Sequence, residues 1–308
     1  MTNTNPLVSV IMNCYNGEEY LQRAIDSICA QTYKNLEIIF WDNASTDRSV
    51  DIYLSNAEKD PRFKYFKSEK HITLGEARAL AVDKCTGEYI TFLDTDDEWI
   101  PDKTEIQIKA MLEDDYVLGY SSVYEVYDYD NKYRTYDIRW KSGKIFANLL
   151  IQFEIQLPTA IIKRDVLIAK GLTFDPFIQA SEEYCLFMQL IYDEKVCVID
   201  KPLAKYYIRK DSLTSKSIDR WAIERRYTLD KIRERHPDYR KYDNEFKEAY
   251  ARGDYYEARF LVSVGNIKGA RSVLAKAIPV SYKYLILYCL LFFPIELWNK
   301  VHLLKNKR

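Results

Sequence analysis

Short apolar runs alternate with longer stretches of helical spacing along the first hundred residues. The apolar runs predict strands at 7–12, 36–41, 63–66 and 89–93. The stretches between them predict helices at 18–30, from about Ser49, and at 74–85. In the first helix Leu21, Ala24, Ile25 and Ile28 share one face. Because strands that alternate with helices pair through right-handed crossovers, the pattern predicts a parallel sheet.

The rest of the chain follows other patterns. Polar and aromatic residues alternate from 117 to 140, which predicts a hairpin or meander, and 157–162 predicts one further strand. Residues 220–277 have helical spacing, broken at His236-Pro237 and near Gly265. We therefore expect one α/β domain with halves 1–99 and 100–218, followed by a helical region, 219–308.

Carboxylates gather where two of the predicted strands end. Asp42 follows the second strand, and Asp94, Asp96 and Asp97 follow the fourth. In open α/β sheets ligands bind outside the carboxyl ends of strands, so these acids are expected to face one crevice. Crowded carboxylates repel one another unless a cation lies among them, and oxygen ligands suit Mg²⁺ and Mn²⁺. A helix-capping acidic turn is the alternative, but three acids after so apolar a strand favour a metal site.

Composition narrows the classes of function. Lys plus Arg (45) nearly equals Asp plus Glu (46), which gives no electrostatic case for nucleic acid as a partner. No Gly-x-Gly-x-x-Gly follows the first strand, which argues against a dinucleotide cofactor. The six cysteines are scattered without a Cys-x-x-Cys pair, and the first residues lack the features of a secretion signal. We therefore expect a cytoplasmic protein with reduced thiols and no zinc site.

Several motifs together resemble glycosyltransferase family 2. They are Ser-Val-Ile-Met-Asn-Cys-Tyr-Asn at 9–16, Asp-Asn-x-Ser-x-Asp at 42–47, Leu-Gly-Glu-Ala-Arg at 74–78 and Gly-Glu-Tyr-Ile-x-Phe-Leu-Asp-x-Asp-Asp at 87–97. The resemblance implies an α/β fold, with a Rossmann-like nucleotide-sugar-binding domain (GT-A type) on a mixed central sheet and a helical carboxyl-terminal region. Residues 1–99 would bind the nucleotide sugar and 100–218 the acceptor.

The resemblance also implies an activity. A sugar would pass, with inversion, from a nucleotide donor to a hydroxyl of a glycan or lipid-linked glycan acceptor, with UDP as the expected nucleotide. Asp42 matches the acid that hydrogen-bonds the base, Asp94 the acid that contacts the ribose, and Asp96 the ligand of Mn²⁺ or Mg²⁺. Tyr15 lies where a loop covers the base, and Arg78 where a basic residue approaches the nucleotide. Plain packing for Tyr15 and a solvated helix charge for Arg78 are the alternatives.

Two departures from the family pattern affect the chemistry. In Glu182-Glu183, which resembles a Glu-Asp-x-x-Leu motif, Glu183 replaces the Asp that acts as catalytic base. Either Glu183 or Glu182 is then the base, unless both only favour the start of a helix electrostatically. Segment 205–214 resembles Tyr-Arg-x-His-x-x-Ser-x-Thr, which closes over the diphosphate, but Tyr207 replaces the Arg and Arg209 replaces a potential metal-ligand His. Arg209 is expected either to clamp a donor phosphate or to be a solvated cation.

The most apolar stretch of the chain is its tail, 282–298. Its uncharged core, 284–295, is shorter than the ~20 residues that span a membrane, and Pro294 interrupts it. Flanking aromatic residues and the basic residues that follow predict a helix lying on the inner face of the membrane, which makes the protein peripheral. Docking of this helix on the protein's own core is the alternative.

Two other functions fit parts of the pattern. A synthase that charges a polyprenyl phosphate needs no strong base, because its acceptor is already ionised. A non-catalytic nucleotide-sugar-binding protein with a decayed site fits the altered base and Arg209. The presence of Asp42, Asp94 and Asp96 opposes that second alternative.

Overall fold

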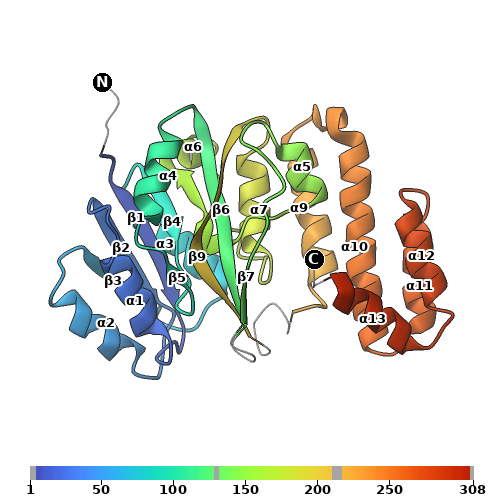
Figure 1. Ribbon diagram of the computed structural model, residues 1–308, viewed down its shortest axis with the longest axis horizontal. Helices are drawn as coiled ribbons and strands as arrows, with labels where there is room; N and C mark the ends of the chain where they lie inside the picture. The colour runs from blue at the N-terminus through green and yellow to red at the C-terminus, as the bar shows by residue number, and fades with distance from the viewer. Residues whose placement is uncertain (1–4, 128–131, 210–216, 306–308) are drawn as a thin grey trace. The chain divides into compact units, whose positions relative to one another are not determined.

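The computed structural model describes residues 5–127, 132–209 and 217–305. The chain divides into two compact units, Met1–Ser212 and Leu213–Arg308. The first unit is built on a sheet and the second consists of helices (Figure 1).

A mixed sheet forms the centre of the first unit. Its strand order is β3-β2-β1-β4-β8-β6-β9-β5, with β7 paired to β6. The strands among the described residues are β1 (Val8–Cys14), β2 (Leu36–Asp42), β3 (Phe63–Lys67), β4 (Tyr89–Phe92), β5 (Glu98–Trp99), β6 (Tyr116–Tyr127), β7 (Lys132–Thr135), β8 (Ile161–Lys163) and β9 (Lys195–Ile208). The sheet is therefore mixed, as predicted.

The parallel half of this sheet confirms the prediction from the apolar runs. β1 pairs in parallel with β2 and with β4, and β2 pairs in parallel with β3. Every residue of β2 and β4 is buried. Strands buried on both faces need apolar side chains on both, which is why these strands appear as continuous apolar runs.

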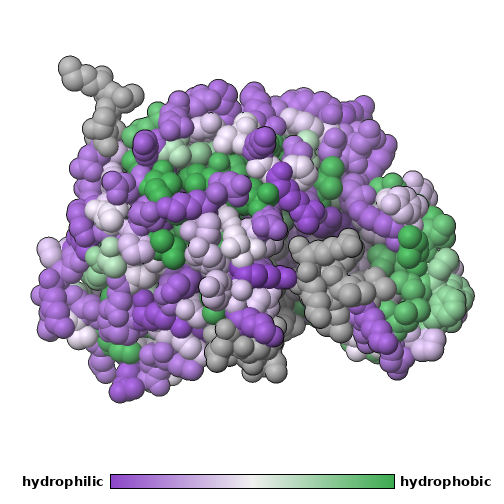
Figure 2. All heavy atoms as spheres, viewed as in Figure 1, coloured by the Kyte–Doolittle hydropathy of each residue, from purple (hydrophilic) through white to green (hydrophobic). Residues whose placement is uncertain are grey.

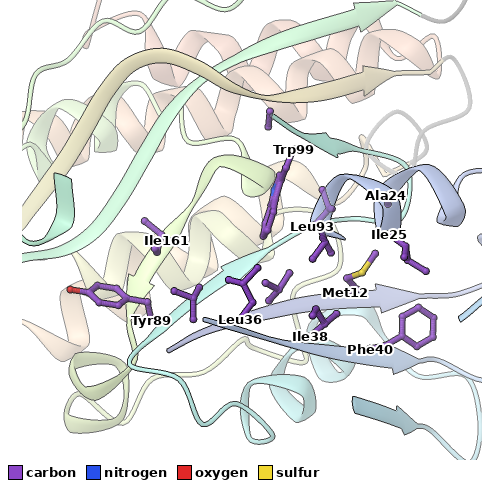
Figure 3. Packing of buried hydrophobic residues seen from close by; sticks show 14 of the residues in the cluster. Met12, Ala24, Ile25, Leu36, Ile38, Phe40, Tyr89, Leu93, Trp99 and Ile161 are labelled. Atoms are coloured by element: carbon purple, nitrogen blue, oxygen red, sulfur yellow. The ribbon is translucent and has the colours of Figure 1, made fainter. Parts of the chain in front are cut away.

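Helices cover the sheet of the first unit. They are α1 (Leu21–Cys29), α2 (Ser49–Ala57), α3 (Leu74–Val82), α4 (Lys103–Met111), α5 (Phe146–Ile151), α6 (Arg164–Ala169) and α7 (Glu182–Leu190). The predicted face of α1 is confirmed, since its four apolar residues are buried. Figure 3 shows Ala24 and Ile25 beside Met12 in the core. Each fully buried side chain of the size of Ile25 or Met12 contributes roughly 1.5–3 kcal/mol.

The second half of the sheet differs from the prediction in two places. The expected strand 157–162 is wrong in its first part, because Leu157–Thr159 forms a 3₁₀ turn that contains Pro158, and only Ile161–Lys163 is extended. A proline has no N–H to donate to a neighbouring strand. The expected hairpin is confirmed, since β6 and β7 are antiparallel. β9 was not predicted; it runs parallel to β6 and pairs with β5.

The second unit consists of helices with breaks where the sequence predicts them. Its elements are α9 (Trp221–Arg235), a 3₁₀ turn (Tyr239–Tyr242), α10 (Asp243–Ser263), α11 (Ile267–Ala277), α12 (Tyr282–Leu290) and α13 (Ile295–Lys305). His236 and Pro237 follow α9, and Gly265 lies between α10 and α11 with a φ of +78°. Glycine adopts this left-handed conformation without strain, so it suits the end of a helix.

The apolar tail has one buried and one exposed side. Tyr284, Leu287 and Trp298 are buried in a core shared with α10 and α11. Ile286 and Phe293 are exposed, at 53% and 60%. Figure 2 shows hydrophobic residues gathered over the region of α11 and α12. Within the described residues, no helix is long and apolar enough to cross a membrane.

Candidate active site

The predicted acids lie at the carboxyl ends of strands on either side of β1. Asp42 is the last residue of β2, and Asp94 follows β4 after one intervening residue. β1 pairs with both of these strands. Neighbouring strands are about 4.8 Å apart, so the two acid-bearing strands are separated by roughly 10 Å. A nucleoside has about this length, and the carboxyl edge of the sheet is where α/β folds bind ligands.

Asp42 and Tyr15 lie at the β2 side of this edge. The buried carboxylate of Asp42 accepts hydrogen bonds from the backbone N–H of Ser45 at 2.9 Å and from the Tyr65 hydroxyl at 3.1 Å. Tyr15 follows β1 and is 50% exposed. Its ring centroid lies 3.9 Å from that of His71, in the loop after β3. This side of the sheet therefore offers a fixed carboxylate, which can accept a hydrogen bond from a nucleobase, and an exposed aromatic ring, which can stack on it.

Arg78 connects the β4 end to the start of α7. Its guanidinium donates to Asp94 Oδ1 at 2.9 Å and lies 3.8 Å from Glu182 Oε2. Arg78 is buried, at 4% exposure. Burial would lower the pKa of Arg78, but the charges of Asp94, Glu182 and Glu183 raise it above its usual value. Arg78 thus remains a cation between two groups of carboxylates.

The surroundings of Glu183 raise the pKa of its carboxyl group. Glu183 lies half-buried in the first turn of α7, next to the fully buried Glu182. Burial, and then the charge of Glu182, raise the pKa of Glu183 to about 7, although Arg78 opposes the shift. A carboxylate with a pKa near neutrality is a better proton acceptor than an ordinary one.

Asp96 is paired with a cation. Arg209 Nη1 donates to Asp96 Oδ2 at 2.9 Å, and the guanidinium carbon of Arg209 lies 3.5 Å from the ring centroid of Tyr20. Burial and the charge of Asp94 raise the pKa of Asp96, and Arg209 opposes that shift. Arg209 is therefore not a solvated cation; it is stacked on an aromatic ring and contacts the acid motif. Residues 210–214 of the segment predicted to close over the diphosphate lie outside the described residues.

The two acids that follow Asp96 are also held by the protein. Asp97 is 1% exposed, and its Oδ1 accepts from the backbone N–H of Tyr207 at 3.0 Å. Burial and the neighbouring acids raise the pKa of Asp97 well above its usual range. Glu98 contacts Arg23 at 3.0 Å and Lys205 at 2.9 Å. The crowded acids thus have cationic or backbone partners within the protein, so their crowding alone does not require a metal ion.

The comparison with protein families identifies the chain. The sequence model described as Glycosyl transferase family 2 matches residues 9–168, more than half of the chain. The chain belongs to glycosyltransferase family 2. The matched region contains β2 to β4, all of β1 but Val8, and the acids at the strand ends, so the resemblance predicted from the motifs is confirmed.

Curated relatives of this family-2 glycosyltransferase carry the same kind of name. An uncharacterised glycosyltransferase from Haemophilus influenzae is 33% identical over 205 residues, which cover 66% of this chain and 79% of the relative. An uncharacterised glycosyltransferase from Rickettsia felis is 31% identical over 216 residues, which cover 70% of this chain but only 35% of the relative. The chain therefore corresponds to about a third of that longer protein.

Solved structures share the fold at low sequence identity. Staphylococcus aureus TarS 1–349 in complex with UDP-GlcNAc matches with a TM-score of 0.71 and 17% identity, over 88% of this chain and 81% of that fragment. The mannosyltransferase PcManGT from Pyrobaculum calidifontis, in complex with GDP-Man and Mn²⁺, matches with a TM-score of 0.63 and 17% identity, over 96% and 84% of the two chains. These matches confirm the predicted GT-A type of fold.

The donor set of the family-2 site suits a shared metal ion. Among the described residues, no three His, Cys, Asp or Glu side chains are placed to hold a metal by themselves. The side chain of Asp96 is 40% exposed, and Arg209 contacts only its Oδ2. One partly exposed carboxylate fits a Mg²⁺ or Mn²⁺ ion that takes its other ligands from substrate phosphates and water.

Several contacts of the site lie beyond sequence reasoning. The sequence pattern indicated the acids, Arg78 and Arg209, but not Tyr20, Arg23 or His71. Tyr20 and Arg23 lie at the start of α1, where the motif gives no hint that they reach the end of β4 or β9. The fold brings Arg23 there, since it donates to the backbone oxygen of Asp96, which lies 73 residues later in the chain.

Proposed function

We propose that this glycosyltransferase moves a sugar from a UDP-linked donor to a hydroxyl of a glycan or lipid-linked glycan, with inversion. The observation that carries the proposal is the guanidinium of Arg78. It contacts Asp94 at 2.9 Å on the donor side and lies 3.8 Å from Glu182, beside the predicted base, on the other. A donor at the β4 end and a base on α7 then lie on either side of a single buried side chain.

The nucleotide end of the donor would bind between β2 and β4. Uracil has one N–H that an acid accepts, and Asp42 is held by Ser45 and Tyr65 at the end of β2. Tyr15 would cover the base and Asp94 would accept from the ribose. The TarS complex contains UDP-GlcNAc, which supports a uridine nucleotide, whereas the PcManGT complex contains GDP-Man. Thermal unfolding with UDP-sugars and GDP-sugars therefore has to distinguish a uridine from a guanosine donor.

The reaction needs charge stabilisation on one side of the sugar and a base on the other. Breaking the bond to the diphosphate builds negative charge on the leaving group, which a Mn²⁺ or Mg²⁺ ion at Asp96 would neutralise. Glu183 would take the proton of the acceptor hydroxyl, and its raised pKa suits that task. Attack on the face opposite the leaving group inverts the anomeric carbon. An already ionised polyprenyl phosphate acceptor would need no such base, so we favour a hydroxyl.

The apolar tail supports binding of the proposed enzyme to a membrane surface. Ile286 and Phe293 expose apolar side chains, and the exposed Lys276 and Lys300 lie in the same helical unit. Apolar side chains flanked by lysines bind to anionic lipid surfaces. We therefore place the protein in the cytoplasm, peripheral on the inner face of the membrane, where lipid-linked acceptors are found.

Thermal unfolding with a panel of nucleotide sugars tests the donor. A ligand at a hundred times its dissociation constant stabilises the folded state by about 2.7 kcal/mol. UDP-sugars with Mn²⁺ should raise the melting temperature, and EDTA should remove most of the gain. GDP-sugars are the matched control. A shift with GDP-sugars alone would contradict the uridine assignment, and no shift with any donor would contradict the proposed function.

A further inference from the structure

The carboxylate of Asp96, the proposed metal ligand, already forms an ion pair with Arg209. Arg209 Nη1 lies 2.9 Å from Asp96 Oδ2, and Nη2 lies 3.5 Å from the backbone oxygen of the same residue. The guanidinium is held from the other side by the ring of Tyr20, at 3.5 Å. The side chain of Arg209 is 19% exposed, less than the 40% of Asp96. Because Arg209 is stacked on an aromatic ring and largely buried, its ion pair with Asp96 is better fixed than an exposed surface ion pair.

The other cations of the site have separate partners. Arg78 contacts Asp94 at 2.9 Å, and Arg23 contacts Glu98 at 3.0 Å. Arg23 also donates to the backbone oxygen of Asp96 at 2.8 Å, which fixes the main chain there. Among the described residues, Arg209 is thus the cation whose ion pair is with the Asp96 carboxylate itself.

Two cations that contact one carboxylate repel each other, and Asp94, the nearest further acid, is already paired with Arg78. A divalent ion on Asp96 would face the guanidinium of Arg209 across the same carboxyl group. The diphosphate of a nucleotide sugar supplies the missing negative charge. Guanidinium groups also bind phosphate oxygens in a planar, bidentate geometry, so a diphosphate offers Arg209 a second partner.

We propose that Arg209 is the counter-ion of Asp96 in the donor-free protein and transfers to the diphosphate when the donor binds. The divalent ion then binds to Asp96 together with the nucleotide and not before it. This inference rests on the proposed function, because the donor's diphosphate is what draws Arg209 away. It explains why an arginine stands at the position of a potential metal-ligand histidine: the site is made dependent on the nucleotide for its metal.

Manganese binding to the full chain tests the inference without any turnover. Free Mn²⁺ is measured by its electron paramagnetic resonance signal, with and without UDP. Wild-type protein should bind Mn²⁺ weakly alone and at least about tenfold more tightly with UDP. Arg209→Gln should bind Mn²⁺ alone about tenfold more tightly than wild type, the change expected from one lost charge-assisted hydrogen bond. UDP should then improve its Mn²⁺ binding far less.

Two controls make the result specific. Arg62→Gln removes an equal cation that pairs with Asp60 before the start of β3, at the opposite edge of the sheet, and should behave as wild type. Asp96→Asn should abolish the Mn²⁺ binding gained in Arg209→Gln. The inference is overturned if Arg209→Gln binds Mn²⁺ alone no more tightly than wild type. It is also overturned if wild-type protein binds Mn²⁺ equally well with and without UDP while UDP itself binds.

Failure of the inference differs from failure of the proposed function. If no nucleotide sugar binds, the thermal panel shows it, and the proposed function fails. The comparison of wild type with Arg209→Gln in Mn²⁺ alone still reports whether Arg209 competes for Asp96. If nucleotides bind but this comparison shows no difference, only the inference about Arg209 fails.

Discussion

At the scale of single residues, the fold depends on a buried carboxylate away from the site. Glu37 in β2 accepts hydrogen bonds from Ser9 Oγ at 2.5 Å, from Thr86 N–H at 2.6 Å and from Lys64 Nζ at 2.6 Å. It is 4% exposed and connects β1, β2, β3 and the turn before β4. Burial opposes its charge, but Lys64, Ser9 and Thr86 lower the pKa of Glu37 to about 2.

We predict that Glu37→Gln lowers the melting temperature at neutral pH by roughly 5–10 °C. The amide cannot satisfy the same donors, and a lost bond of this kind costs about 2–3 kcal/mol. The pKa of Glu37 is lower in the folded than in the unfolded protein, so its contribution is complete above about pH 4.3 and is lost as pH falls toward 2. Thermal scans from pH 7 to pH 3 should show the two proteins converging. Lys201→Gln, which removes an exposed partner of Asp102, is the control and should change little.

The residues of the site were only partly predictable from the sequence. Asp42, Asp94 and Asp96 follow apolar runs directly, and a strand's end fixes where such residues point. The partners of these acids were not predictable, since Arg23 and Arg209 reach Asp96 from α1 and from beyond β9. Burial of Arg78 against Glu182 likewise depends on where α7 packs. Spacing along one element says nothing about such contacts.

At the scale of elements, predictability followed burial. β2 and β4 are buried along their whole length, β1 is buried at every residue but Asn13, and all three appear as largely apolar runs. β3 was also predicted, from its aromatic residues, although only Phe63 of this strand is buried. β9 was missed because charged residues and Pro202 interrupt its apolar pattern. Its pairing with β6 shifts register beside Pro202, where an irregular strand tolerates a residue without an N–H. β5 has only two residues, too few for any pattern to indicate.

The apolar tail, which contains α12, gives a prediction at this scale. Deleting the tail would strip buried Tyr284 and Leu287 from the core, so changes on its exposed side test lipid binding more cleanly. Ile286→Glu with Phe293→Glu should abolish sedimentation with anionic vesicles and leave the melting temperature unchanged. Ile168→Glu, at an exposed apolar residue of α6, is the matched control and should still sediment.

Lipid composition and salt complete this test. Anionic lipid should strengthen binding of the wild-type chain, because each basic residue near a charged surface adds about 1 kcal/mol. Added salt should weaken only that increment. If wild-type protein fails to sediment with any vesicle, the exposed side of the tail has another role and the membrane is removed from the proposal.

At the scale of the whole molecule, the proposed donor site and the proposed catalytic base both lie in the first unit. The family match and the acids at the carboxyl edge of the sheet both lie within residues 1–212. We propose that the helical unit affects where the enzyme works and not its chemistry. The central claim is that this site breaks the bond between a sugar and a nucleotide with Glu183 as base.

Release of UDP from UDP-sugars in the presence of Mn²⁺ and a hydroxyl acceptor tests that claim most directly. Wild-type turnover should rise with pH through about 7, as Glu183 ionises. Glu183→Gln should bind the donor normally but turn over roughly 10²–10⁴-fold more slowly, without that pH dependence. Glu182→Gln should keep most of the turnover. The assignment of the base would be contradicted by unchanged turnover in Glu183→Gln, or by a loss in Glu182→Gln instead. The proposed activity as a whole would be contradicted if the wild-type chain released no UDP from any UDP-sugar.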